Sequence, residues 1–232
     1  IGIGANTAMF SAIHALLMKP LAFPEIDRVV AIWDRSPLSG RLHDEVTLPN
    51  YLDWRAMQRS FTDLALFRRD SMNLSSRGEE TPPERITGAV MTWNMMSIVG
   101  LKPVLGRDLT EAEDVPGGPK VALISEGLWR RHFGKSPKAL GQQLVIDAVP
   151  REIIGVLPDE MRIARRADVY LPLGDMRADK NNLQRDNHPG FSVLGRLKAG
   201  VTLQQARSNL DNIAHALTAL GFTPSNKEAK RK

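Results

Sequence analysis

The chain of 232 residues contains no cysteine. Disulfide bridges, thiolate metal sites and cysteine nucleophiles are therefore excluded. The absence does not decide the compartment, because a chain of this length can bury an adequate core in an oxidising periplasm without disulfides. Aromatic residues make up only 6% of the sequence, and most of them lie in apolar runs. This pattern argues against the exposed stacking surfaces of nucleic-acid-binding proteins.

Patterns that carry catalysis or bind metals are also missing. No two histidines are spaced for shared metal binding on one helix, and no H-E-x-x-H or G-x-S-x-G pattern occurs. We therefore expect no catalytic residue, no metal ligand and no cofactor. The sequence identifies no residue that binds a substrate or partner. The five histidines, each expected to be structural or exposed, are His14, His43, His132, His188 and His215.

Two weaker patterns have more ordinary explanations. Residues 2–6 resemble part of a nucleotide-binding fingerprint, but no strand precedes them and no G-K-[ST] follows. Asp108, Glu111, Glu113 and Asp114 form an acidic cluster before a Gly-Gly pair, which leaves a cation site open as an alternative. Their spacing does not match an EF-hand, and carboxylates also favour the start of a helix.

Positive charge gathers at one end of the sequence. Of the net charge of +5, residues 227–232 supply four cations and one anion. This tail is either a solvated segment or one that lies near an anionic surface, lipid or nucleic acid. The arginine pairs at 68–69, 130–131 and 165–166 are dispersed. We therefore do not expect a nucleic-acid partner.

The first 18 residues contain no charged side chain, and the first charge is Lys19. The polar residues in this stretch make it marginal as a complete membrane span. We expect a helix from Asn6 or Thr7 to Met18 that is the end of a membrane helix and its extension into water. The alternative is a buried N-terminal core helix. On the first interpretation, the chain is an extracytoplasmic domain of a bacterial membrane protein that lies between two membrane helices.

The remaining sequence alternates between strand and helix patterns. Capping residues mark several helix starts, such as Thr47, Ser125 and the boxes Thr110-x-x-Glu113 and Thr202-x-x-Gln205. We expect strands at 28–35, 85–90, 120–124, 143–147, 151–157, 168–173 and 191–198, and one within 61–75 that is centred on 64–67 and that 73–75 could continue. We expect helices at 48–58, 92–99, 125–133 and 202–220, a turn at 78–83 and a loop at 175–189.

This order predicts an α+β fold in which a flanking α/β part with βαβ units is interrupted by a β-rich insertion. The composition becomes acidic and rich in Gly and Pro between 106 and 119. We therefore place the insertion at 104–175, the flanking subdomain at 21–103 and 176–221, the membrane-helix end at 1–20 and the basic tail at 222–232.

Several segments together resemble the MacB-like periplasmic core domain of ABC-transporter permeases, especially the duplicated orphan permeases of acidobacteria. They occur in the expected order from about residue 1 to 220. The segments are GIGANTAMFS (2–11), LLMKPL (16–21), PNYLDWR (49–55), LGRDL (105–109), VALIS with LW (121–125, 128–129), IIGVLP (153–158) and GRLKAGVT with QA (195–202, 205–206).

The resemblance implies a porter-like α/β subdomain interrupted by a sabre-like one. It also implies a non-catalytic periplasmic domain, attached to the inner membrane, that relays ATP-driven movement to substrate or to a periplasmic partner in efflux or export. The implied partners are a cytoplasmic ATPase, a periplasmic adaptor and a second permease copy or half. Two alternatives stay open: a periplasmic ligand-sensing domain of a receptor, and a soluble hydrolase with dispersed catalytic residues.

Overall fold

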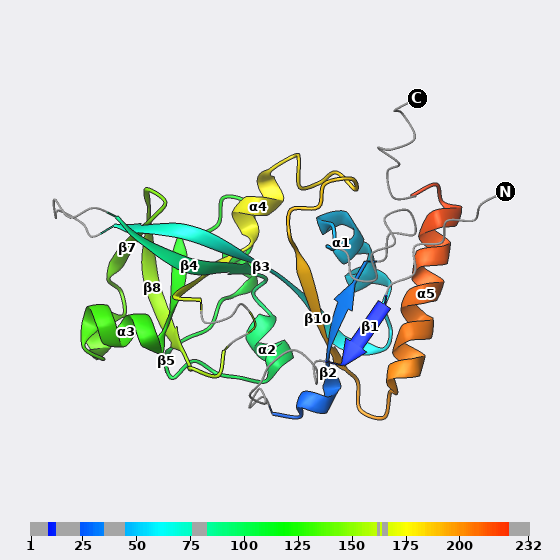
Figure 1. Cartoon of the computed structure of the whole chain (residues 1–232), viewed down its shortest axis with the longest axis horizontal. Helices are drawn as coiled ribbons and strands as arrows, with labels where there is room; N and C mark the ends of the chain where they lie inside the picture. Colours follow the sequence, from blue (N-terminus) through cyan, green and yellow to red (C-terminus); the bar gives the residue numbers. More distant parts are fainter. Residues whose placement is uncertain are drawn as a thin grey trace. The chain divides into compact units, whose positions relative to one another are not determined.

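The structure is a computed structural model, and it describes residues 24–34, 45–75, 83–161, 163 and 167–222, together with the backbone of 9–12. The chain divides into two compact units (Figure 1). Unit 1 comprises residues 1–18, 27–66 and 179–232, and unit 2 comprises 19–26 and 67–178.

The sheet of unit 1 contains neighbouring strands in the order β1 (Met9–Ala12), β2 (Val29–Trp33), β10 (Ser192–Leu197) and the first part of β3 (Phe61–Ser75). The β1–β2 and β2–β10 pairs are antiparallel. Ser60 O accepts from Lys198 N, and the Thr62 hydroxyl donates to Arg196 O, so β10 and β3 also run in opposite directions. Strands β2 and β3 therefore run the same way, and with α1 they form a βαβ unit split by β10.

The two main helices of unit 1 lie side by side (Figure 1). Helix α1 (Leu48–Met57) begins at Thr47, whose hydroxyl accepts from Asn50 N at 3.3 Å. Helix α5 (Leu203–Ala219) begins at a complete capping box, in which Gln205 N donates to the Thr202 hydroxyl and Thr202 N donates to Gln205 Oε1. A short 3₁₀ helix, η2 (Ile26–Arg28), leads into β2. The face that α5 buries consists of Ala206, Leu210, Ile213, Ala214 and Leu217.

The core of unit 1 requires a glycine at one point of β10. A Cβ at Gly195 would lie 2.6 Å from Phe61 Cδ1 and 2.8 Å from Leu64 Cδ2. Both of those side chains are fully buried on β3. The close approach of β10 to β3 therefore depends on the missing side chain.

Six strand segments of unit 2 pair in a closed ring. The ring runs from the later part of β3 through β4 (Glu84–Met91), β9 (Val169–Pro172), β6 (Val121–Ser125), β8 (Val149–Leu157) and β7 (Gln143–Ile146) back to β3. The β4–β9 and β6–β8 pairs are parallel, so the sheet is mixed. A two-residue strand, β5 (Leu105–Gly106), pairs with β8 beyond the ring.

The residues of the ring alternate between a buried and a more exposed face along β3 and β4. Met72 and Ile86 are opposite each other and both are buried, whereas the neighbouring Ser71, Asn73 and Arg85 are exposed. This alternation is that of strands with one face against a core. By register, the side chains on the face of Met72 include Leu74, Val90, Leu144, Ile146, Ile153, Ala122, Ile124, Val169 and Leu171, all buried.

Short helices complete unit 2. They are α2 (Met95–Val99), η3 (Glu111–Glu113), α3 (Glu126–Phe133), η4 (Pro137–Ala139) and α4 (Gly174–Ala178). Gly100 and Gly134 end α2 and α3 in the left-handed conformation.

The α+β class and most predicted elements are confirmed, but four local predictions need correction. Residues 9–12 form a strand rather than part of a helix, because they pair with β2. Helix propensity is a local property and does not include pairing with a distant segment. Helix α2 begins after Asn94 rather than Thr92, and the first residues of the predicted loop 175–189 belong to α4. The turn between β7 and β8 lies at Asp147 and Ala148, so β8 starts at Val149 rather than at the predicted residue 151. Most of the predicted turn 78–83 lies outside the described residues.

The division into units also differs from the one expected from composition. Unit 2 begins at Phe67 rather than near 104, while its end at Ala178 lies close to the expected 175. The reason is that β3 and β4 join the ring through β9 and β7, which follow more than 50 residues later in the chain. A change of composition does not report such long-range pairing. The assignment of the sabre-like part to 104–175 stays a prediction.

Candidate functional site

A polar cavity of about 320 Å³ lies in unit 2 beside the start of α3. This volume is at the lower end of the range for small-ligand sites. Three chain segments contribute to it: α3 with its capping residue, the stretch that follows β8, and the stretch that enters β9. The lining residues are Ser125, Gly127, Arg130, Arg131, Pro158, Asp159, Met161, Ala167, Asp168 and Tyr170.

The sequence explains why α3 begins at the cavity. Ser125 ends β6 in an extended conformation, and its hydroxyl accepts from Leu128 N at 3.0 Å. The helix then carries Arg130, Arg131 and His132 in its last turn, where cations interact favourably with the carbonyl end of the helix. The Ser125 hydroxyl therefore has a capping role, and the arginines stabilise the other end.

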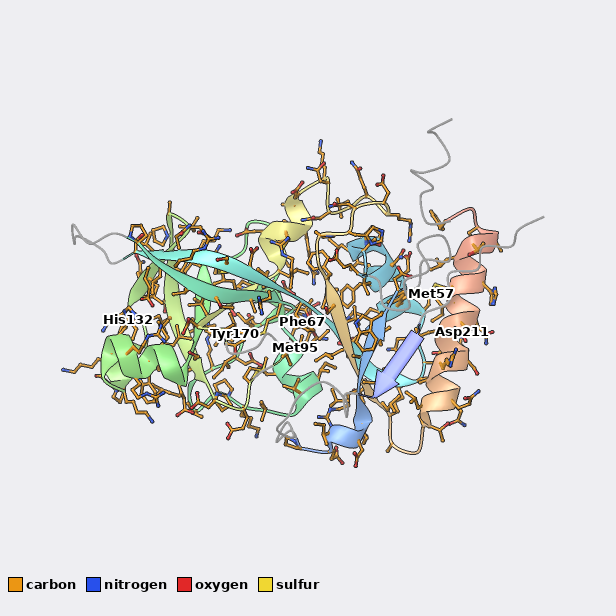
Figure 2. The ribbon with its side chains drawn as sticks, in the orientation of Figure 1. Met57, Phe67, Met95, His132, Tyr170 and Asp211 are labelled. Carbon is orange, nitrogen blue, oxygen red and sulfur yellow. The ribbon has the colours of Figure 1, made fainter. Side chains whose placement is uncertain are left out.

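Most of the charge beside the cavity is paired within the protein. Arg131 donates to Asp168 Oδ1 at 3.0 Å and to Glu84 Oε1 at 3.1 Å. His132 Nε2 lies 2.9 Å from Glu84 Oε2, so α3 is tied to the start of β4 (His132 is labelled in Figure 2). Burial lowers the pKa of Arg131, but the hydrogen bond and charge of Asp168 and the charge of Glu84 outweigh it, and the pKa is raised.

Tyr170 supplies a neutral hydrogen-bond donor at the cavity (Figure 2). Its hydroxyl donates to Met161 O at 2.8 Å, and the side chain is buried. Burial raises the pKa of Tyr170, and the negative charges of Asp168 and Asp159 raise it further. The phenol therefore keeps its proton at all physiological pH values and holds the Met161 backbone in place.

The hydroxyl groups at the cavity serve the local backbone. Among the described lining residues, Ser125 and Tyr170 carry hydroxyls, and both hydroxyls are engaged with backbone groups. No histidine is among these described lining residues. Among the described residues, no three histidine, aspartate or glutamate side chains are placed to hold a metal ion.

The acidic cluster singled out in the sequence is dispersed among separate partners. Glu113 accepts from Arg107 through both carboxylate oxygens, at 2.6 and 3.0 Å, and also closes the capping box with Thr110. Asp114 accepts from Arg177 Nη2 at 3.0 Å and from Trp93 N at 3.2 Å. These carboxylates therefore accept hydrogen bonds from separate groups of the protein and do not converge on one common point.

The pKa values in this cluster diverge for physical reasons. Burial raises the pKa of Asp108 to about 6; a hydrogen bond from Leu109 N lowers it, and the charge of Glu113 adds to the rise. Burial also acts to raise the pKa of Glu113, but hydrogen bonds from Arg107 and Thr110 outweigh it and the pKa is lowered. Both effects follow from local structure, because Glu113 accepts from both terminal nitrogens of Arg107, whereas the Asp108 carboxylate accepts from Leu109 N.

The histidines are not brought together. His14 and His43 lie outside the described residues. His132 pairs with Glu84, His188 Nδ1 lies 3.0 Å from Glu45 O, and His215 is exposed on α5. The three described histidines therefore have the structural or exposed roles that the sequence predicted.

Sequence reasoning missed two arginines with distant partners, the buried Arg151 in unit 2 and the half-buried Arg185 in unit 1. Arg151 lies on β8, is 9% exposed and reaches Asp175 at 3.4 Å, and Lys120 pairs with the same carboxylate. Arg185, in the stretch expected to be a loop, binds Asn50 and Asp53 on α1. Nothing in the local pattern marks these arginines, because their partners are distant in sequence.

Comparison with known proteins decides the family. Residues 1–213 match the model of the MacB-like periplasmic core domain. The chain belongs to this family. The family's members are periplasmic core domains of ABC-transporter permeases, which agrees with the resemblance noted from the sequence. No curated protein matches the chain.

Solved structures share the fold of this MacB-like domain. The periplasmic region of MacB from Actinobacillus actinomycetemcomitans superposes with a TM-score of 0.61 at 16% identity, over 85% of this chain and 86% of that one. The extracellular domain of the noncanonic ABC-type transporter YknZ from Gram-positive bacteria gives 0.57 at 18% identity, over 78% and 87%. A domain of a putative permease protein from Porphyromonas gingivalis gives 0.57 at 17% identity, over 90% and 89%. In the ranges that the structure describes, no helix has the length and apolar character of a membrane span.

Proposed function

We propose that this MacB-like domain is the periplasmic part of an ABC-transporter permease and relays ATP-driven movement to a substrate or to a periplasmic partner. The observation that carries the proposal is the family match over residues 1–213. The shared fold with the periplasmic region of MacB supports it. In this proposal the chain performs no chemistry; ATP is hydrolysed by a cytoplasmic ATPase, and a second permease copy or half completes the assembly.

The course of the chain is compatible with a mechanical role. Strand β3 is 15 residues long and is hydrogen-bonded to β10 in unit 1 and to β4 in unit 2. A strand paired along its length resists extension, because stretching it would break several backbone hydrogen bonds at once. We propose that a displacement of one unit reaches the other through β3, with the two units turning relative to one another about this strand. In this proposal a membrane helix N-terminal to β1 delivers the displacement.

Accessibility in cells tests the location. In a cysteine-free intact permease, Lys138→Cys and Gln204→Cys place single thiols at exposed positions, one in each unit. A membrane-impermeant maleimide should label both in intact cells with a permeabilised outer membrane. Labelling only after the inner membrane is lysed would place the domain in the cytoplasm and end the proposal.

Spin-label distances test the relay. Labels on Lys138→Cys and Gln204→Cys in the intact permease with its ATPase should change their separation between the nucleotide-free and ATP-bound states. A matched pair within unit 2, Lys138→Cys with Lys102→Cys, should keep its separation. An ATPase variant that cannot bind ATP should abolish the change. Equal distance distributions in both nucleotide states for the first pair would contradict movement between the units.

A further inference from the structure

The turn between β7 and β8 is strained. Asp147 and Ala148 connect the two strands, and their φ angles are 48° and 64°. A two-residue hairpin loop with both φ angles positive normally contains Asn or Asp followed by Gly, because a Cβ is unfavourable in the left-handed region. Asp147 suits the first position, but Ala148 occupies the position that glycine normally takes. Such strain persists only where surrounding contacts hold the backbone in place.

Hydrogen bonds to β3 hold this turn. Asp147 N donates to Asn73 O at 2.9 Å. Asp147 Oδ1 accepts from Asn73 N at 2.9 Å and from Asn73 Nδ2 at 3.0 Å. The carboxylate therefore takes the acceptor position that a backbone carbonyl has in an antiparallel ladder. We call these three bonds the Asp147 latch. Both residues are exposed, so water competes for the donors and acceptors of the latch.

The latch lies at the end of a short joint in the ring. In the described part of the chain, β7 pairs with β3 at two positions, Leu74 with Ile146 and Ser75 with Val145. Leu74 and Ile146 are buried, whereas Ser75 and Val145 are partly exposed. We call these two pairs the β3–β7 seam.

A second joint of the ring is equally short but better protected. Strand β6 pairs with β9 through Leu123 with Tyr170 and Ile124 with Val169, and none of these four residues is more than 1% exposed. The β3–β7 seam is instead partly exposed and ends at a strained turn. It is therefore the joint at which opening the ring costs least.

We propose that the Asp147 latch is a reversible catch of the ring. While it is closed, β7 stays against β3; when it breaks, β7 leaves β3 and the ring opens at this seam while the other joints stay paired. The strain at Ala148 favours the open state, because the turn can relax once the latch is released. This conformational device goes beyond the proposed function and does not depend on it.

Native-state hydrogen exchange of the 232-residue chain tests the proposal. By the alternation of the antiparallel ladder, the Val145 amide faces β3 as the Asp147 amide does. Both amides should exchange together, with a lower opening free energy and a smaller dependence on denaturant than the Leu173 amide, which donates to Met91 O at the β4–β9 joint. Equal opening free energies for all three amides would overturn the proposal. Fast exchange of the Asp147 amide alone would also overturn it, because only the tip of the hairpin would then fray.

A variant at position 147 tests the latch. Asp147→Ala removes the carboxylate and should raise the opening constant, measured at the Val145 amide, about tenfold, because the acceptor of two hydrogen bonds is lost. Asp147→Asn keeps an acceptor and should stay within about twofold of the parent. The matched control, Asp179→Ala, removes an exposed carboxylate that accepts from Asn181 N in unit 1, and it should leave the opening constant unchanged. An equal rise in the control would contradict the role of the latch.

A variant at position 148 tests the strain. Ala148→Gly should lower the opening constant about threefold or more, because glycine adopts this φ angle without strain. Ala112→Gly, at an exposed alanine of unit 2 without a positive φ angle, should leave it unchanged. An unchanged or raised opening constant for Ala148→Gly would refute the contribution of the turn. The Leu173 amide reports in every variant that the unit stays folded.

Discussion

Arg177 Nη2 lies 3.0 Å from Oδ2 of Asp114, whose side chain has no exposed surface. Asp114 follows η3, and Arg177 belongs to α4, so the pair joins two segments of unit 2 that are 63 residues apart. Trp93 N donates to the same oxygen, which brings the end of β4 into the contact. Three separate segments therefore meet at one buried carboxylate.

Removing the guanidinium should be costly. Arg177→Met leaves the Asp114 carboxylate buried without its cation, and we expect a loss of about 3 kcal/mol in the free energy of unfolding. Urea unfolding followed by tryptophan fluorescence measures it. The matched control is Lys135→Met, which removes a half-exposed cation 3.7 Å from Glu126 and should cost under about 1 kcal/mol. Similar losses for both variants would show that Arg177 contributes no more than a surface ion pair.

Asp108 should make stability depend on pH. Its pKa is raised from 3.8 to about 6 in the folded protein, chiefly by burial. The folded state therefore binds more protons than the unfolded state between these values, so stability falls as pH rises through this window and stays lower above it. Asp108→Asn keeps an acceptor for Leu109 N and removes the buried charge. We expect a gain of about 1–3 kcal/mol at pH 7.5, little change below pH 4, and a flatter profile between.

The measurement is urea unfolding of both proteins from pH 4 to 8. Asp147→Asn serves as the control, because Asp147 is exposed in the turn before β8 and Asn keeps the acceptor for Asn73 N, so this change should give no comparable gain at pH 7.5. A gain for Asp108→Asn that is equal at pH 4 and pH 7.5 would mean that ionisation of Asp108 is not its cause.

Gly88 should not tolerate a side chain while the Met72 side chain lies against it. A Cβ at Gly88 would lie 2.2 Å from Met72 Sδ. The methionine must move within a packed core, so Gly88→Ala should cost about 1–3 kcal/mol. Met72→Ala removes the obstacle, and the double variant should lose less than the sum of the two single changes. Strict additivity of the two losses would contradict direct contact between the two side chains.

Gly127→Ala in α3 is the matched control. The added Cβ meets only the Ser125 hydroxyl, at 3.4 Å, so this change should be neutral or slightly stabilising.

The capping box of α5 should contribute measurably to unit 1. Thr202→Ala removes the hydroxyl that accepts from Gln205 N, and we expect a loss of about 1 kcal/mol. Thr218→Ala is the comparison, because its hydroxyl only donates to Ala214 O within the helix, and it should be nearly neutral. Hydrogen exchange of the first turn of α5 reports the local effect, and equal protection in both variants would refute the capping role.

The sequence was informative wherever the signal is local. The Thr47 and Ser125 caps and the Thr202 box all form as their spacing predicted, because each needs residues only three positions apart. The helix expected over 7–18 includes a strand, and unit 2 starts at Phe67, because both outcomes depend on pairing between distant segments. Family resemblance, carried by ordered short segments, gave more about function than any single residue did.

The residues of the candidate site likewise depend on contacts between segments that are distant in the sequence. The cavity beside α3 was not readable from the spacing of residues in the sequence. Its lining combines Ser125, Arg130, Asp159 and Asp168, which no sequence period connects. Arg185 does lie in irregular structure, as expected for this polar stretch, but its partners, Asn50 and Asp53, precede it by more than 130 residues and no local pattern reveals them. Charge partners at such separation are set by the fold.

Strand β7 closes the ring of unit 2 with only two residue pairs to β3, Leu74 with Ile146 and Ser75 with Val145. These pairs cover only the end of the β3 edge, and loss of their hydrogen bonds would expose backbone donors and acceptors of both strands beside the buried apolar side chains of Leu74 and Ile146. Earlier in β3, the charged Arg68, Arg69 and Asp70 oppose pairing with another molecule. The seam between β3 and β7 is therefore where aggregation of this domain should begin, and where a stabilising substitution would best extend its shelf life.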